Sequence, residues 1–165
     1  MKRHVARWGM PVIAGAITLL VSSSTAFAAT PAQVSANPSP YATPGCMALD
    51  NQPGSKSYLN SEVEPQVAID PTNPLHLVGA WQQDRWSNGG SHGLVAGYSF
   101  DGGASWTVSP EPFSICYHAS GYSGAYLNYQ RASDPWTSIG PGTPGSPLSG
   151  STVYASSLSF DQTAY

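Results

Sequence analysis

The octapeptide Ser99–Trp106 constrains the fold of this chain more than any other stretch. It reads S-F-D-G-G-A-S-W and follows a short apolar run. Asp101 can accept hydrogen bonds from backbone N–H groups two or three residues further on, as in an Asx turn. Gly102 and Gly103 tolerate positive φ, so the chain can reverse direction tightly. Trp106 then begins the returning strand with its indole against the hairpin. The octapeptide predicts a rigid β-hairpin whose turn is capped by its own side chains.

Runs of alternating apolar residues predict the other strands of the same sheet. They mark four segments, which we expect to pair antiparallel: Glu64–Asp70, Leu75–Gln83, Gly93–Phe100 and Trp106–Val108. The segments between them are rich in Pro, Gly, Ser and Asn, as turns are. No stretch after residue 28 has the apolar period of a helix. The sequence therefore predicts an all-β fold, and a chance Asp-Gly hairpin in another β architecture is the alternative to a four-stranded repeating unit.

The octapeptide resembles the Asp-box (BNR) repeat, S-x-D-x-G-x-T-W, of the sialidase superfamily of β-propellers. Ser105 stands where Thr is commoner, and the matching positions are Ser99, Asp101, Gly103 and Trp106. In that family the repeat has a structural role, on the outer turn between the third and fourth strands of a blade. Further segments are similar to secreted proteins of this class: Asn60–Val67, Trp81–Gly90 and Arg131–Trp136. The resemblance covers about residues 60–161 and implies a sialidase-like β-propeller.

The strand pattern begins a second time after a long loop. The segment Ser133–Ile139 parallels the residues around Glu64 and Pro65, and Thr152–Phe160 parallels the second predicted strand. We therefore expect a first blade over residues 60–109, a loop over 110–130 and the start of a second blade over 131–165. Because propellers close with about four to eight blades, the chain is interpreted as a fragment or truncated chain with about one and a half blades.

The first 28 residues predict an export signal. Lys2, Arg3 and Arg7 form a basic start, an apolar run follows, and Ala26–Ala28 fits the A-x-A cleavage rule. The run is shorter than the roughly 20 residues that span a bilayer, which argues against the alternative of an uncleaved anchor. We expect cleavage near Ala28, no stable membrane anchor, and a secreted or periplasmic protein. Residues 29–59, which are rich in Pro and Ser, are expected to form an extended lead-in.

The chain contains two cysteines, Cys46 and Cys116. In an oxidising compartment we expect them to form a disulfide, and two free buried thiols are the alternative. The histidines after the signal, His76, His92 and His118, are too scattered to predict a zinc site. We expect neither a metal nor a cofactor.

Charged residues are sparse, and their balance bears on which kinds of molecule the protein can bind. All nine acidic residues follow the predicted cleavage site, whereas only Lys56, Arg85 and Arg131 among the basic residues do, so the exported part has a formal charge of −6. Such a surface lacks the patch of basic residues with which proteins bind nucleic acid or an anionic membrane. A neutral or weakly polar partner suits it better.

The resemblance implies a protein that acts on glycans. Sialidases clamp the substrate carboxylate with three arginines and use a Tyr nucleophile activated by Glu together with an acid/base Asp. Only two arginines follow the signal here, and the Arg-Ile-Pro motif that opens a sialidase domain is absent, so no sialidase catalytic residue is transferred. A more general glycosidase needs two carboxyl groups. The candidates at strand ends are Glu64, Asp84 and Asp134, which could alternatively cap turns or pair with arginine.

Aromatic and basic residues near these carboxylates are the candidates for substrate binding. They are Arg85, Arg131, Trp81, Trp136 and Tyr122. The sequence thus predicts an exported glycan-acting propeller that is a glycoside hydrolase in its full-length form, while the fragment itself is expected to be inactive. The alternative is a non-catalytic adhesion module that binds glycans or proteins, and the missing arginines favour it.

Overall fold

Antiparallel β-strands dominate the computed structural model, which describes residues 32–50, 53–140 and 150–162. The strands are β1 (Ser57–Asp70), β2 (Asn73–Trp86), β3 (Ser91–Ser99), β4 (Thr107–Pro110), β5 (Arg131–Gly140) and β6 (Thr152–Phe160). Short helical turns also occur, at α1 (Pro44–Met47), η1 (Ala48–Asp50) and α2 (Ile115–Ala119). The predicted all-β class is confirmed.

The predicted export signal lies outside the described residues. Within the described residues no helix is long and apolar enough to cross a membrane.

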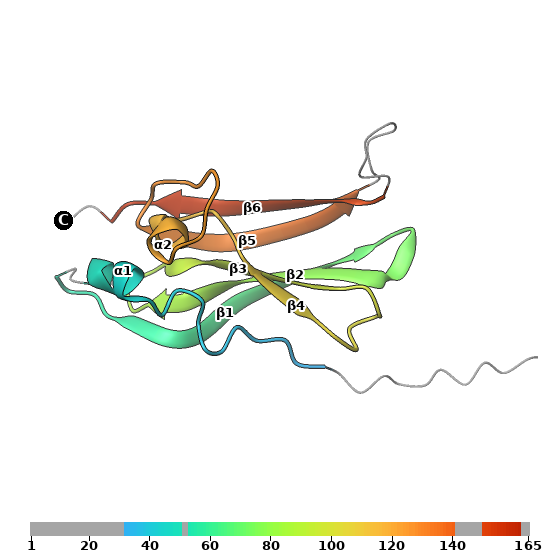
Figure 1. Ribbon diagram of the computed structural model, residues 1–165, viewed down its shortest axis with the longest axis horizontal. Helices are drawn as coiled ribbons and strands as arrows, with labels where there is room; N and C mark the ends of the chain where they lie inside the picture. Colours follow the sequence, from blue (N-terminus) through green and yellow to red (C-terminus); the bar gives the residue numbers. More distant parts are fainter. Residues whose placement is uncertain (1–31, 51–52, 141–149, 163–165) are drawn as a thin grey trace, which may run out of the picture.

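The first four strands form an antiparallel meander in which β1 pairs with β2, β2 with β3, and β3 with β4. Strand β5 joins the edge of β3 through a single residue pair, Ser91 with Ala132, and then pairs along its length with β6. It also lies against β1 and β2 without pairing with them. The backbone N–H of Thr137 on β5 donates to the Gln66 side chain of β1 over 2.9 Å. The β5–β6 hairpin is therefore a second layer beside the meander (Figure 1).

The segment before β1 forms a layer on the opposite side of the meander from the hairpin (Figure 1). Its Tyr41 side chain is fully buried against Trp81 and Val95. The Tyr41 hydroxyl donates to the carbonyl of Leu94 over 2.6 Å. Part of the segment predicted as an extended lead-in therefore folds into α1 and η1 and covers the sheet, because its aromatic and small apolar side chains find partners there.

The predicted disulfide is confirmed. Cys46 of α1 is bonded to Cys116 of α2, across a sequence separation of 70 residues. Both cysteines are buried beside Trp81 and Val95. The bridge therefore ties the segment before β1 to the loop after β4, and both are held over the same face of the meander.

The turn between β3 and β4 has the self-capped geometry that its sequence predicts. The Ser99 hydroxyl accepts from the backbone N–H of Gly103 over 2.9 Å, and the Asp101 carboxylate accepts from that of Ser105 over 2.9 Å. The Trp106 indole N–H donates to the Gly103 carbonyl over 3.1 Å. Hydrogen bonds from Ser105 and Ser99 lower the pKa of Asp101 to about 2. The main donor to Asp101 lies four residues on, rather than the two or three expected, because two glycines with φ of 75° and 89° widen the turn.

Candidate functional site

Four non-glycine residues of the described chain have a backbone in the left-handed region. They are Asn60, Glu64, Asp84 and Asp134, with φ of 60°, 55°, 62° and 49°. Three of the four are the carboxylates that the sequence marks as catalytic candidates. A positive φ costs about 1–3 kcal/mol for such residues and concentrates at functional sites, where the surrounding structure enforces it. Each of these positions lies on a strand rather than in a turn, so the cause of the strain is to be found in the pairing of the strands.

Glu64 and Asp134 occupy equivalent β-bulges. On β1, Val63 pairs with Gln82 and Gln66 with Ala80, so three steps on β1 oppose two on β2. On β5, three steps from Ser133 to Trp136 likewise oppose two on β6. Each carboxylate is followed by a proline, which has no N–H to give to the ladder. Bulges are common beside active sites because they redirect a side chain. The two segments that are similar in sequence therefore also share the same local backbone irregularity.

Both bulged carboxylates are exposed, and β1 and β5 lie against one another. The Glu64 carboxylate accepts a hydrogen bond from the amide of Gln82, which is fully buried. The same Gln82 side chain accepts from the Arg85 guanidinium over 3.0 Å through its other atom. Glu64 is thereby held in place and linked to Arg85 through one amide. No corresponding side-chain hydrogen bond is present for Asp134 within the described residues.

Trp136 follows Asp134 on the outer face of the hairpin and is 63% exposed. Tyr154 and Leu158 of β6 are also largely exposed. Ser156 lies opposite Trp136 in the ladder, and Tyr154 lies two residues away on the same strand. An exposed indole beside an exposed carboxylate offers both a stacking surface and a proton-transfer group.

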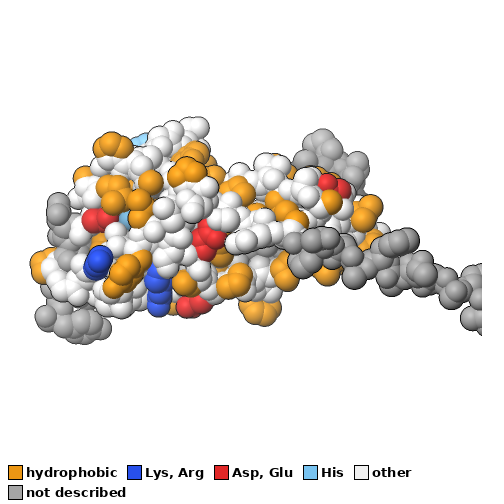
Figure 2. Space-filling view, turned by 90° about the horizontal axis from the view of Figure 1, so that it is seen from below, with side chains coloured by type: hydrophobic (Ala, Val, Ile, Leu, Met, Phe, Trp, Pro, Cys, Tyr) orange, Lys and Arg blue, Asp and Glu red, His pale blue; other side chains and the backbone are white. Residues whose placement is uncertain are grey.

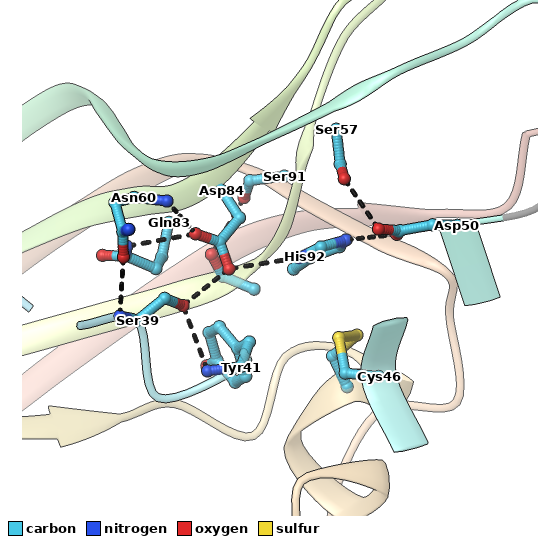
Figure 3. A network of polar contacts seen from close by, with 12 residues as sticks. Ser39, Tyr41, Cys46, Asp50, Ser57, Asn60, Gln83, Asp84, Ser91 and His92 are labelled. Carbon is cyan, nitrogen blue, oxygen red and sulfur yellow. Dashed lines mark hydrogen bonds and ion pairs between the residues drawn. A yellow bond between two sulfur atoms is a disulfide. The ribbon is translucent and has the colours of Figure 1, made fainter. Parts of the chain in front are cut away.

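Asp84 has a different environment from the other two carboxylates, because it is fully buried (Figure 3). Its oxygens accept from the Ser39 hydroxyl over 2.6 Å and from the backbone N–H of Asn60 over 2.7 Å. A third contact, of 3.1 Å, joins it to Nδ1 of His92. Burial by itself would raise the pKa of Asp84, but the hydrogen bonds from His92, Ser39 and Asn60 outweigh burial and lower it. Asp84 is therefore an ionised scaffold group that joins three segments of the chain.

His92 lies between two carboxylates and is 1% exposed. Its Nε2 is 2.6 Å from Asp50 Oδ1, and its Nδ1 contacts Asp84 (Figure 3). Burial alone would lower the pKa of His92, but the hydrogen bonds to Asp84 and Asp50 raise it. Because a carboxylate oxygen lies within hydrogen-bond reach of each ring nitrogen, these contacts favour the imidazolium form, in which both nitrogens donate. This cluster was not predicted from the sequence, where its one signal is the placement of Asp84 and His92 on either side of a short loop.

The remaining predicted binding residues are mostly turned inward. Trp81 is buried, and its indole N–H donates to the Gln83 side chain over 2.9 Å. Arg131 is 1% exposed, lies 4.4 Å over the Trp86 ring, and donates to the Gly89 carbonyl over 2.6 Å. Tyr122, in the loop after β4, stacks on Tyr117 with ring centroids 5.2 Å apart. Of the five binding candidates, Trp136 is the one with a largely exposed side chain, and Arg85 is half-buried beside the Glu64 bulge.

Within the described ranges, no group of three or more His, Cys, Asp or Glu side chains is arranged to hold a metal ion. Comparison with known proteins returned no matching family model, no matching curated protein and no matching solved structure.

Proposed function

We propose that this chain forms the first part of a sialidase-like β-propeller that acts on glycans and, in its full-length form, hydrolyses glycosidic bonds. The four-stranded meander with its Asp-box turn corresponds to one blade, and the β5–β6 hairpin beside it to the start of the next. The repeated bulge supports this correspondence, since β1 and β5 share the same kink at the same acidic position. The exposed outer face of the hairpin, with Trp136 and Tyr154, would receive a further blade or a ligand.

The observation that carries the proposed function is the pair of strained, exposed carboxylates on equivalent bulges. Glu64 and Asp134 each have a positive φ, each precede a proline, and stand on strands that contact one another. Glycoside hydrolysis needs two carboxyl groups, one to protonate the leaving oxygen and one to act as nucleophile or base. We assign these roles to this pair and give Asp84 a structural role, because its carboxylate is buried and its oxygens are occupied.

The structure favours a neutral sugar as substrate over an anionic one. The Arg131 guanidinium stacks on Trp86 and donates to loop carbonyl and amide groups, while Arg85 donates to Gln82 and to the Gly90 carbonyl. A carboxylate clamp would need planar guanidinium groups aimed at the ligand. Charged side chains are also sparse on the face shown in Figure 2, where hydrophobic and uncharged polar groups predominate. Trp136 offers the apolar surface on which a sugar ring can stack.

We further infer that the chain is exported to the cell exterior or the periplasm. The Cys46–Cys116 disulfide supports this, because such bonds persist in oxidising compartments.

A second candidate function is that of a non-catalytic module that binds glycans or proteins. Its specific support is the burial of Asp84, which removes one of the three predicted acids from contact with a substrate. The stacking surface at Trp136 would serve such a module equally well.

A panel of chromogenic glycosides, assayed with the intact gene product, tests the proposal. We expect turnover of at least one neutral glycoside and no turnover of a sialoside. Binding to a glycan array without turnover of any glycoside would support the non-catalytic module instead. Neither binding nor turnover would contradict both candidate functions.

A further inference from the structure

A cleft of about 310 Å³ lies between the meander and the start of β6, and the bulged carboxylates do not line it. Its walls are Val78 and Ala96 from the sheet and Val153 from β6. A neighbouring hollow of about 510 Å³ shares His76, Phe100 and Val153 with it. Phe100 and Val153 line the cleft and are exposed, so the cleft is open to solvent at these residues.

One end of the cleft is aromatic. Tyr98 and Phe100 meet edge to face with ring centroids 5.8 Å apart, and His76 stacks on Phe100 with centroids 4.7 Å apart. Phe100 is exposed although it is a large apolar side chain. These rings form a surface that fits a flat apolar or aromatic group in offset or edge geometry.

The other end of the cleft is anionic. The backbone N–H of Glu111 donates to the carbonyl of Leu94, which fixes Glu111 beside that residue of β3. Tyr98 lies four residues further along β3, and a rise of about 3.3 Å per residue places the two ends about 13 Å apart along the strand. Within the described chain the Glu111 carboxylate has no hydrogen-bond partner, and burial raises its pKa to about 7. Among the described residues that line the cleft there is no Lys or Arg to neutralise the charge.

The geometry points to a binding site for an arylalkyl ammonium ion, with its aryl ring against Tyr98 and Phe100 and its ammonium group at Glu111. Charge complementarity selects the cation, because a half-buried carboxylate without a counter-ion gains a charge-assisted hydrogen bond when an amine arrives. The apolar walls select a hydrocarbon linker over a polar one. The separation of the two ends selects a linker of several carbons. This site is independent of the proposed glycan function.

Other titratable groups lie near Glu111 and bear on the pH dependence of binding. His76 and Tyr98 line the same cleft, and Asp70 contacts His76 over 3.2 Å. Tyr41 lies behind Glu111 and donates to its backbone carbonyl over 3.3 Å. Binding of an ammonium ion requires ionised Glu111, so affinity should rise with pH. A carboxyl group with a pKa of about 7 is about one-tenth ionised at pH 6 and nine-tenths at pH 8, which gives roughly a tenfold change.

Isothermal titration of the full chain with 4-phenylbutylamine tests the site without any mutation. The neutral analogue 4-phenylbutanol has the same shape, and benzylamine has the same charge on a shorter linker. We expect 4-phenylbutylamine to bind about tenfold more tightly than either analogue at pH 8, the amount expected of one charge-assisted bond. Equal affinity for the amine and the alcohol, or no binding of the amine, would overturn the proposal.

Glu111→Gln should lower the affinity for 4-phenylbutylamine about tenfold at pH 8 and abolish its rise between pH 6 and pH 8. Asp161→Asn removes an exposed carboxylate outside the cleft and is the matched control; it should bind the amine as the unmodified chain does. If the pH dependence persists in Glu111→Gln, it arises from another group and the assignment to Glu111 is wrong. Circular dichroism confirms that both variants fold.

Discussion

The Nε2 atom of His92 lies 2.6 Å from Oδ1 of Asp50, and this contact joins the central sheet to the segment that precedes it. Through its other nitrogen His92 also holds Asp84, which binds Ser39 and the backbone of Asn60. One imidazolium thus compensates two carboxylates at a place where residues 39, 50, 60, 84 and 92 converge (Figure 3). The cluster stabilises the scaffold that carries the bulge on β1.

Replacing His92 should destabilise the protein strongly. In His92→Gln the buried Asp84 carboxylate loses its cationic partner, and breaking a buried pair in this way costs about 3–5 kcal/mol of the free energy of unfolding. Urea unfolding followed by circular dichroism measures the change. His118→Gln is the matched control, because His118 is exposed on α2 and its replacement should change stability by less than about 0.5 kcal/mol. Equal stability of the two variants would show that the cluster contributes little.

The same cluster predicts how stability depends on pH. The pKa of His92 is raised, so its contribution is complete below its ordinary value of 6.5 and is lost as pH rises through the folded pKa. The pKa of Asp84 is lowered, so its contribution is present above its ordinary value of 3.8 and is lost as pH falls through the folded pKa. We expect a plateau of unfolding free energy between these two values. In His92→Gln the decline of the unfolding free energy on the alkaline side should disappear. If the decline persists in this variant, a group other than His92 causes it.

The hydroxyl of Ser99 should contribute more to the stability of the turn between β3 and β4 than its small size suggests. It is buried and accepts from the backbone N–H groups of Gly103 and Asp101. Ser99→Ala leaves these donors without an acceptor, which should cost about 1–3 kcal/mol of unfolding free energy. Ser105→Thr keeps the hydroxyl that donates to Asp101 and should be nearly neutral. Thermal unfolding of the two variants makes the comparison, and an equal loss in both would contradict the assigned roles.

The disulfide should contribute stability mainly by restricting the unfolded chain. It closes a loop with a sequence separation of 70 residues, for which chain entropy predicts about 4 kcal/mol. The double variant Cys46→Ala/Cys116→Ala should therefore unfold at a much lower urea concentration. The double variant is used because each single variant would leave one cysteine as a free, reactive thiol. An unchanged midpoint would mean that the noncovalent contacts of the covering segment, such as those of Tyr41 with Leu94 and of Asp50 with His92, hold it without the bridge.

Local patterns were sufficient to predict most of the strands and the self-capped turn between β3 and β4. Strand β6 has the bounds that its alternation predicts, Thr152–Phe160. Strand β1 is twice as long as predicted because it begins at Ser57, and the bounds of β2, β3 and β4 differ from the predicted ones by one to three residues. The turn could be predicted because every donor and acceptor in it lies within a few residues of Asp101. Turn chemistry and two-residue alternation are both local properties, and a sequence displays them directly.

The segment before β1 and the burial of Asp84 could not be predicted in the same way. Helix α1 has four residues, which is too short to show a helical period. Asp84 is a polar residue at a strand end, where exposure is the usual expectation. Its burial depends on Ser39, which is 45 residues away in the sequence. Contacts of this length leave no pattern in a single sequence, so the scaffold role of Asp84 emerged only from the fold.

The kinetics of Glu64→Gln and Asp134→Asn in the intact gene product test the central claim most directly. With the glycoside that the panel identifies, each substitution should lower kcat about 10²–10⁴-fold, as expected for loss of an acid or base group. Both side chains are exposed, so urea unfolding should show little change in stability. Trp136→Ala should mainly raise KM. If both carboxylate variants retain the kcat of the unmodified protein, the bulged strands do not carry the chemistry and the proposed function is wrong.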